Sequence, residues 1–598
     1  MRSLLAAALA GLTCMPLALS EESGPPAARP SADPVESDTL LRAMLFEVRR
    51  ARHLAGYGIV PFFVELGVDE AENVTLSASL GASFPPQRSR FRIQMPAVRV
   101  GSPLLDNTGY IGSEHYTGTQ FDSEIISSDN EMYSLRASFW LGLDRAYKTG
   151  VEAIGKKQAA LNDYTAQDRL PDFLAAPRVS IVQDLQKSPS FDEARWNERV
   201  RAFSAGFRTL PGILSADSEL TWSAGAFYYC NSDASVLRVP DRLAVLRLRA
   251  TAAIEKGGDV INGFQFVAPE PSGLPDDPEL KRLAEQTAAE LSALVKAPEA
   301  EAYTGPVLFE ARAAAQLFAE VFGQELAIQR KPVAEKGRNV PVPQSSLENK
   351  LGSRVLPAWM SLRDDASRKQ WNGATLAGFY EADMEGVAPA PVTLVEKGIL
   401  KGYLTTRQPV KGASVSNGHA RLPGSFGAHA ARPGNLFVDA DETVPDAQLR
   451  QRLLDMLKQQ GKPYGLLIRR MDYPSLMPGS SLREMAMKQM RSGGGARLFS
   501  APLLAYRLYA DGREELVRGL RFKNLGTRAF RDILAAGATP ALFEYVDNGA
   551  PMALTGAGSY IVGCASVAPA VLFEELDLEP ASDETTRPPL VPPPPMTK

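Results

Sequence analysis

Few side chains in this sequence are of the types that catalyse reactions or hold metal ions. The chain has four histidines, and two of them, His419 and His429, flank Arg421 in a glycine-rich segment. Two loop histidines ten residues apart could share a metal ion, or could lie near each other by chance. A carboxylate, Glu320, stands close to the end of the apolar segment 305–324, whose pattern predicts a helix. These residues are the first candidates for a site.

The six residues around Glu320 resemble a known motif with two of its members replaced. Residues 319–324 are Ala-Glu-Val-Phe-Gly-Gln. They resemble His-Glu-x-x-x-His, most often His-Glu-Ala-Val-Gly-His, which ends a similar helix in the TldD/PmbA family of metallopeptidases. The glutamate and the glycine are kept, whereas both histidines are replaced.

Three later segments carry the same resemblance. Residues 380–387 are similar to the family's Asp-Asp-Glu-Gly-Val-Pro turn, and residues 392–404 to its Leu-Ile-Glu-Asn-Gly-Ile-Leu-Lys-Gly-Tyr hairpin. Residues 416–421 resemble its Thr-Gly-Asn-Gly-Arg-Arg segment more loosely. The resemblance therefore extends over the region from 300 to 580, in the family's order, and the preceding residues match only in general character.

The resemblance implies a zinc ion held by the two motif histidines and a cysteine from the C-terminal domain, with the motif glutamate as general base. A catalytic zinc takes about three protein ligands and leaves one position for water. Ala319 has no donor atom, and the amide oxygen of Gln324 is a poor zinc ligand. Glu320 would then lack the metal-bound water that makes such a base useful.

The third ligand position also lacks a cysteine. Counting back from residues 569–576, which resemble the family's closing strand, places Thr555 near the cysteine position, with Cys564 as a displaced alternative. We therefore expect Ala319, Gln324 and Thr555 to be degenerate metal positions, with no cofactor bound there.

Three functions are consistent with this pattern. The first is a pseudoenzyme that acts as a non-catalytic binding or partner subunit. Its partner would be a catalytic TldD-like subunit or a second copy, because the family's second type of subunit lacks the motif and pairs with a catalytic one. The second is an active metallopeptidase with a rearranged zinc site, combining Glu320 with His419, His429 or Cys564. The third is a periplasmic peptide- or envelope-binding protein that holds a ligand without cutting it.

Composition narrows the classes of partner. A chain of 598 residues is long enough for two or three domains. Hydrophobic content of 44% and charged content of 22% are ordinary for a globular protein. With 65 basic and 69 acidic residues and no long run of like charge, the sequence gives no case for a nucleic-acid partner.

The first 20 residues have the composition of a secretory signal. Arg2 precedes the apolar run 4–12, and small residues stand at Ala18 and Ser20, which predicts cleavage after Ser20. The apolar run is well short of the ~20 residues that span a membrane, so we expect no transmembrane anchor. The signal predicts a periplasmic or secreted protein.

Removal of the signal leaves two cysteines, Cys230 and Cys564. In an oxidising compartment they could form a single disulfide. Cys564 lies in the apolar run 561–565, where a buried free thiol fits as well.

Periodicity predicts the main elements. Helices are expected at 40–48, with Ser37 or Asp38 as N-cap, at 133–161, and at 278–295 with Asp277 as N-cap. Strands are expected at 60–66, 74–80, 90–95, 504–509 and 558–564, and within 220–266 around a turn at 231–233.

Composition shifts divide the chain into five parts. They are the signal peptide (1–20), a disordered leader (21–38), an N-terminal α/β domain (39–272), a TldD/PmbA-like C-terminal domain (273–580) and a proline-rich tail (581–598). The fold class is α+β, with an N-terminal α/β domain followed by a β-rich C-terminal domain.

We predict that the mature chain begins at Glu21 after export from a Gram-negative-type cell, because the charged start, short apolar core and small cleavage residues match a secretory signal. Mass spectrometry of the protein purified from its native cell would measure the N-terminus. A cytoplasmic chain that retains Met1 would contradict this.

Overall fold

The computed structural model describes residues 35–111, 124–162, 170–185, 191–254, 258–335, 337, 344–423, 428–473, 499–547 and 561–581. The expected signal peptide, Thr555 and the tail beyond residue 581 lie outside these ranges.

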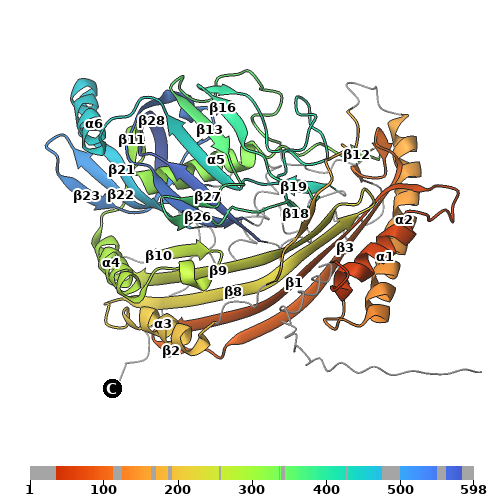
Figure 1. The fold of residues 1–598 in the computed structure, drawn as a ribbon. Helices are drawn as coiled ribbons and strands as arrows, with labels where there is room; N and C mark the ends of the chain where they lie inside the picture. The colour runs from red at the N-terminus through yellow and green to blue at the C-terminus, as the bar shows by residue number, and fades with distance from the viewer. Residues whose placement is uncertain are drawn as a thin grey trace, which may run out of the picture.

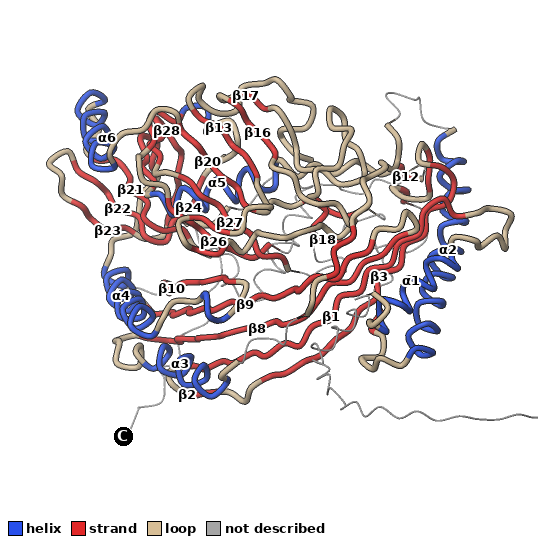
Figure 2. Tube along the Cα trace, in the orientation of Figure 1, coloured by secondary structure: helices blue, strands red, loops and turns tan. Residues whose placement is uncertain are grey.

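The longest strands lie side by side in one curved sheet of nine strands (Figures 1 and 2). Its main order is β10-β9-β8-β1-β3-β4. The strands are β1 (Pro61–Ser79), β2 (Ala82–Ser83), β3 (Gln87–Ser102), β4 (Leu105–Asp106), β6 (Glu124–Ile125), β7 (Ser180–Val182), β8 (Ile213–Asn231), β9 (Val236–Ala253) and β10 (Asp259–Ala268).

The prediction of separate strands at 60–66 and 74–80 was wrong, because β1 is continuous over 19 residues. The polar residues 67–73 looked like a connection. In the fold they pair with β3 on one side and with β8 on the other, which satisfies their backbone groups throughout. The predicted strand at 90–95 and the turn at 231–233 are confirmed within β3 and between β8 and β9.

Helices cover one face of this sheet. They are α1 (Thr39–Ala51), α2 (Met132–Leu161), α3 (Glu193–Ala205) and α4 (Asp277–Lys296). Alternate residues of β1 point to this face, so Leu66 packs in one cluster with α1 and α2, and Leu76 in another with α3 and α4. Asp38 caps α1 as predicted. The predicted cap of α4 was off by one residue, because Asp276 accepts the N–H of Glu279.

The C-terminal half of the chain (residues 303–581) contains a second sheet, which has seven strands. Its order is β23-β22-β21-β11-β28-β24, with β25 paired to β28. The strands are β11 (Tyr303–Phe309), β21 (Tyr464–Met471), β22 (Pro502–Tyr509), β23 (Glu514–Val517), β24 (Leu520–Phe522), β25 (Ile533–Ala536) and β28 (Val571–Pro580).

The apolar segment 305–324 is not one helix, as its pattern had suggested. Its first residues belong to the central strand β11, and the helix α5 (Ala311–Glu325) follows Glu310. Strand β11 lies between β21 and β28, and its residues 305–309 are all buried. A strand buried on both faces is uniformly apolar, so hydrophobic periodicity could not separate it from the helix.

A third sheet, of six strands, has the order β17-β16-β13-β20-β27-β26. Helix α5 packs between this sheet and the second one, in contact with β26 and β27 on one side and with β21 and β11 on the other. The strands are β13 (Met360–Asp364), β16 (Val392–Glu396), β17 (Ile399–Leu400), β20 (Asn435–Ala440), β26 (Ala541–Asp547) and β27 (Val562–Ala568).

Short elements complete the described chain. They are β5 (Tyr110–Ile111), β12 (Val333–Ala334), β14 (Gln370–Trp371), β15 (Ala374–Thr375), β18 (Ala420–Pro423), β19 (His429–Ala431), α6 (Asp446–Gln460), and the 3₁₀ turns η1 (Pro271–Gly273) and η3 (Ala529–Asp532). The α+β class is confirmed, with its β-rich C-terminal half. The division at 272/273 remains a prediction.

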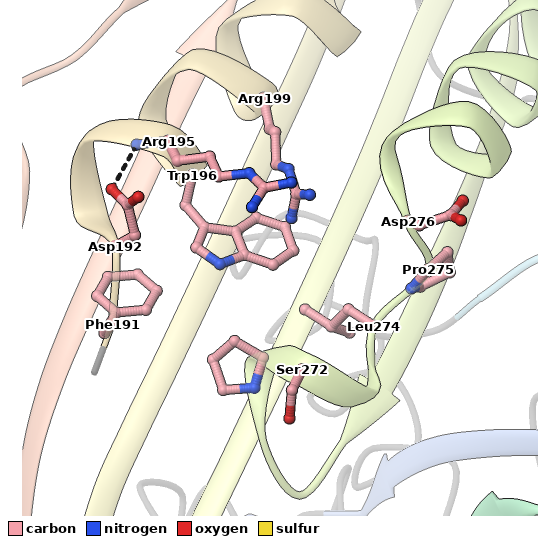
Figure 3. A pocket seen from close by; sticks show the side chains of 10 residues that line it. Phe191, Asp192, Arg195, Trp196, Arg199, Ser272, Leu274, Pro275 and Asp276 are labelled. Carbon is pink, nitrogen blue, oxygen red and sulfur yellow. Dashed lines mark hydrogen bonds between the residues drawn. The ribbon is translucent and has the colours of Figure 1, made fainter. Parts of the chain in front are cut away.

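Cys230 on β8 and Cys564 on β27 are buried free thiols, so the disulfide alternative does not hold. Within the part of the chain that the structure describes, no helix is both long and apolar enough to span a lipid bilayer. A pocket opens on the helix-covered side of the first sheet, between α3 and the start of α4 (Figure 3).

The two halves meet where the turn 383–387 packs on the first sheet. Gly386 has φ of 68°, and a Cβ there would lie 2.6 Å from the ring of Tyr229 on β8. A side chain at this position would therefore be strained by its backbone conformation and would also press the halves apart.

We predict that Gly386→Ala lowers the free energy of unfolding by about 2–4 kcal/mol, the sum of a left-handed alanine and an overpacked contact. Gly373→Ala is the matched control, because Gly373 also has positive φ, 84°, but open space around its Cβ position. Denaturant unfolding measures both. Equal losses in the two variants would show that the contact with Tyr229 contributes nothing.

Candidate functional site

The residues that align with the family's metal motif lie on the last turns of α5. Ala319 is buried and Gln324 is half-buried. The helix continues without a break through Gly323 to Glu325. Positions five residues apart on a regular helix are separated by about 140° around its axis. Ala319 and Gln324 therefore point in different directions, as well as lacking the groups that bind zinc.

Glu320 is held by hydrogen bonds to neighbouring segments. Its Oε1 accepts from Nε2 of Gln316 at 2.8 Å, and its Oε2 accepts from the backbone N–H of Ser500 at 2.9 Å. Gln316 also donates to the backbone oxygen of Asp472. Burial raises the pKa of Glu320, although the hydrogen bonds from Ser500 and Gln316 oppose this shift. The carboxyl group of Glu320 thus ties α5 to the segment at Ser500, and Gln316 ties the same helix to Asp472.

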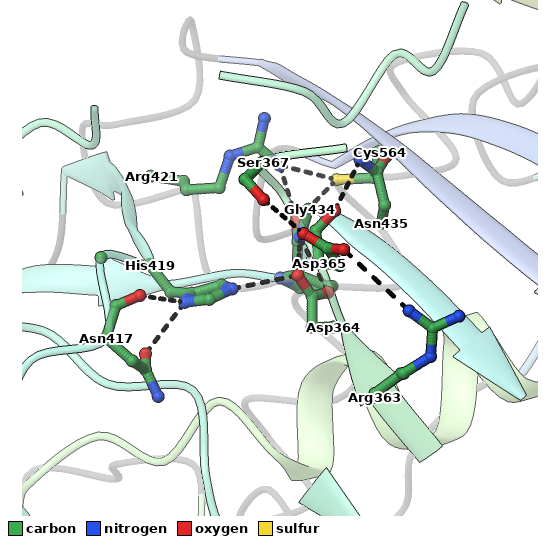
Figure 4. Close-up of polar contacts among 12 residues, drawn as sticks. Arg363, Asp364, Asp365, Ser367, Asn417, His419, Arg421, Gly434, Asn435 and Cys564 are labelled. Carbon is green, nitrogen blue, oxygen red and sulfur yellow. Dashed lines mark hydrogen bonds and ion pairs between the residues drawn. The ribbon is translucent and has the colours of Figure 1, made fainter. Parts of the chain in front are cut away.

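His419 lies in a fully buried polar cluster (Figure 4). Its Nε2 is 3.0 Å from Oδ1 of Asp364, and its Nδ1 is 2.9 Å from Oδ1 of Asn417. That amide oxygen also accepts from the N–H of Thr405, while the amide nitrogen donates to Tyr403, which fixes its orientation. Both ring nitrogens of His419 therefore face acceptors, and neither presents a lone pair to a metal ion.

Arg421 and Cys564 form the second part of this cluster (Figure 4). Arg421 donates to the backbone oxygens of Pro433 at 2.6 Å and Gly563 at 2.8 Å, and its guanidinium stacks over the ring of Tyr380. The Sγ of Cys564 lies 3.3 Å from the same guanidinium. Burial raises the pKa of the Cys564 thiol to about 12, so at neutral pH it is protonated and is not a thiolate ligand.

His429 belongs to a different pair. Its Nδ1 is 3.1 Å from Oε1 of Glu385, whose Oε2 accepts the backbone N–H of Arg407 at 2.6 Å. Burial acts to raise the pKa of Glu385, but His429 and Arg407 lower it by more. For His429, burial acts to lower the pKa, but Glu385 and the nearby carboxylates of Glu65 and Asp383 raise it by more.

The structure thus separates the candidates that the sequence had suggested. His419 and His429 bind different carboxylates, and Glu320 binds Gln316 and Ser500. Within the described ranges, no three side chains of His, Cys, Asp or Glu are grouped as a metal site would require. The acidic partners were missed, although the resemblance of residues 380–387 to a family turn had pointed to the region of Glu385.

We predict that the buried His429–Glu385 pair makes stability depend on pH. The raised pKa of His429 contributes stability below its ordinary value of 6.5, which is lost as the pH rises through the raised value. The lowered pKa of Glu385 contributes stability above its ordinary value of 4.5, which is lost as the pH falls through the lowered value. The pair is therefore strongest between pH 4.5 and 6.5.

His429→Gln keeps a hydrogen-bond donor but removes the charge, and should cost about 3 kcal/mol in that window and less at alkaline pH. Denaturant unfolding across pH measures this, with the exposed His53→Gln as control. A cost that does not change with pH would show that the pair carries no charge.

Comparisons with known proteins agree with this fold. Residues 302–478 match the family model described as PmbA/TldA metallopeptidase C-terminal domain. Three solved structures are similar over most of the chain: a candidate modulator of a DNA gyrase from Thermotoga maritima MSB8, TldE from Thermococcus kodakarensis, and a candidate modulator of DNA gyrase from Bacteroides thetaiotaomicron VPI-5482. A search of curated proteins finds no match.

These structures share the fold at low sequence identity. They are 13%, 11% and 12% identical to this chain, with TM-scores of 0.54, 0.54 and 0.52. The matches cover 89%, 90% and 90% of this chain and 99%, 99% and 98% of the other chains. Residues 302–478 therefore carry the match to the C-terminal domain of the PmbA/TldD family, and the solved structures show that the fold is shared over most of the chain.

Proposed function

We propose that this chain is an exported member of the TldD/PmbA family that has lost its zinc site and acts as a non-catalytic binding or partner subunit. The main support for the proposal is the set of residues at the motif positions of α5 and the hydrogen bonds that Glu320 makes. Its motif positions hold Ala319 and Gln324, and both carboxylate oxygens of Glu320 accept hydrogen bonds from the protein itself.

The residues present do not fit a catalytic zinc. Three protein ligands would be needed, and Ala319 can supply none. Recruiting His419 would break its hydrogen bond to the buried Asp364, which would keep the backbone N–H of Gly434 as a partner. Losing a hydrogen bond to a buried carboxylate costs about 1–3 kcal/mol. Cys564 would have to lose a proton beside backbone oxygens that already engage it.

Glu320 takes no general-base role in the proposed function. Such a base acts on a metal-bound water, and the motif positions Ala319 and Gln324 offer no ligand set to hold one. Gln316 and the Ser500 N–H each donate one hydrogen bond to the carboxyl group. The carboxyl group has a structural use instead, because it satisfies the buried backbone N–H of Ser500.

Retention of the surrounding fold favours a role in binding or assembly. In this family the second type of subunit lacks the metal motif and pairs with a catalytic subunit, and TldE from Thermococcus kodakarensis shares this chain's fold. We therefore propose a catalytic TldD-like protein as the partner, with a second copy of this chain as the alternative. A peptide held without cleavage would be the ligand.

We predict that the full chain, purified without chelator, holds well under one zinc ion per molecule, because the motif positions supply no ligand set. Elemental analysis measures the metal, and peptide hydrolysis is assayed on the same sample. Glu320→Gln should leave any hydrolysis unchanged and lower stability by about 1 kcal/mol, the value of one hydrogen bond.

Glu310→Gln is the matched control, since Glu310 begins the same helix but is exposed and paired with Arg469. Stoichiometric zinc that is lost together with hydrolysis in Glu320→Gln, but not in Glu310→Gln, would make this chain an active peptidase. The partner is tested separately, by co-purification of the tagged chain from its native cell. Failure to recover a catalytic relative there would remove that part of the proposal.

A further inference from the structure

The pocket between α3 and α4 is small and has an apolar interior (Figure 3). Its volume is about 310 Å³, at the lower end of the range of about 300–1,000 Å³ for ligand pockets. Trp196 and Leu274 contribute the most buried part of its lining, and the half-buried Phe191, Pro271 and Pro275 complete the apolar surface. A pocket of this size and composition holds one apolar side chain rather than an extended segment.

Two arginines of α3 form the basic part of the lining. Arg195 and Arg199 lie one helical turn apart, and both pair with Asp277 at the start of α4. These two guanidiniums lower the pKa of Asp277, so its carboxyl group is ionised at neutral pH. Two positive charges against one negative charge leave one positive charge in excess. Because a guanidinium has five N–H donors, both arginines keep donors for an anionic group.

Two aspartates form the acidic part of the lining. Asp192 caps α3 and Asp276 caps α4, each through its Oδ1, which accepts the backbone N–H of Arg195 and Glu279 respectively. Within the described ranges, the Oδ2 of neither aspartate accepts a hydrogen bond. The two caps therefore present free carboxylate oxygens, which are acceptors for a cationic group.

The pocket thus offers separate groups for the two signs of charge. An anion would gain hydrogen bonds only from the arginines and a cation only from the aspartates, whereas a zwitterion gains from both. A quaternary ammonium ion prefers free aromatic faces and is less well matched, because the guanidinium of Arg199 already stacks over the ring of Trp196 at 4.3 Å. The apolar lining selects, among zwitterions, one that carries an apolar side chain.

We propose that this pocket binds a small zwitterion with an apolar side chain, either a free apolar amino acid or a short peptide that ends in one. The carboxylate of the ligand faces the two guanidiniums, its ammonium group faces the free oxygens of the capping aspartates, and its side chain packs against Trp196 and Leu274. The site lies on the helix-covered face of the first sheet, away from α5, and does not depend on the function proposed above.

Isothermal titration calorimetry of the full chain tests the ligand class, with L-phenylalanine and glycyl-L-phenylalanine as probes. Saturable binding of either supports the proposal, and the tighter of the two identifies the source as a free amino acid or a peptide. N-acetyl-L-phenylalanine lacks the ammonium group and L-phenylalanine amide lacks the carboxylate. Each should bind about tenfold more weakly than L-phenylalanine, because hydrogen bonds between charged groups are lost. Equal binding of either derivative, or no binding of both probes, would overturn the proposal.

Variants of the lining test the location of the site. Asp192→Asn/Asp276→Asn keeps both helix caps, since asparagine caps as well as aspartate, but removes the two negative charges. It should weaken binding of the tighter probe by about tenfold, and Arg195→Gln should weaken it by about fivefold.

Two variants outside the pocket serve as matched controls. Asp511→Asn removes the same charge from an exposed turn, where Asp511 accepts the backbone N–H of Arg513. Arg201→Gln removes a guanidinium of α3 that pairs with Glu198. Neither should change the affinity. An affinity that the pocket variants leave unchanged, or that the controls lower equally, would place the binding elsewhere and overturn the site.

Discussion

A buried charge, the guanidinium of Arg407, forms one of the contacts that hold the two halves of this protein together. It lies 4.6 Å from the ring centre of Phe63 and 4.1 Å from that of Phe173, and its Nε donates to the backbone oxygen of Leu174. Its own backbone N–H donates to Glu385. Moving a charge out of water costs several kcal/mol unless aromatic faces and acceptors replace the solvent. The N-terminal half provides these groups, so the position of the loop around Arg407 depends on the first sheet.

The same requirement applies to the candidate groups described in the C-terminal half. Buried charges must be paired, and here each candidate group is paired inside the fold. His419 binds Asp364, Arg421 binds backbone oxygens, and Glu320 binds the Ser500 N–H. These hydrogen bonds tie the segments around α5 to one another.

The local sequence pattern was sufficient to predict part of the secondary structure. The 30-residue helix α2 followed from apolar residues at helical spacing, and the cap at Asp38 from its residue type. The hairpin of β16 and β17 was implied by the family resemblance of residues 392–404, and in its turn Lys397 and Gly398 both have positive φ. Local pattern failed at β11 and in the middle of β1, because both owe their structure to strands far away in the sequence.

The candidate site was predictable only as far as residue identities allowed. The identities of Ala319 and Gln324 at the motif positions are visible in the sequence, and an alanine lacks a side-chain donor atom wherever it lies. The partners of His419 and His429 were not visible, since Asp364 and Glu385 lie 55 and 44 residues away and are brought near by sheet pairing. Arg407 had no sequence signal at all, because its role comes from rings in the other half.

The pairing of β11 has a consequence for how the chain acquires its structure. Residues 303–309 lie at the centre of the second sheet, but one of their two neighbours is β28, where Tyr303 pairs with Leu578. In the first sheet, β1 likewise pairs with a strand that comes much later in the sequence. Glu65 on β1 pairs with Asn231 on β8, which follows it by 166 residues. Such distant pairings form slowly, because a long loop must close before any contact is gained. The second sheet therefore assembles only once nearly all of the chain has been made, and until then β11 presents an apolar edge that must be shielded from other chains.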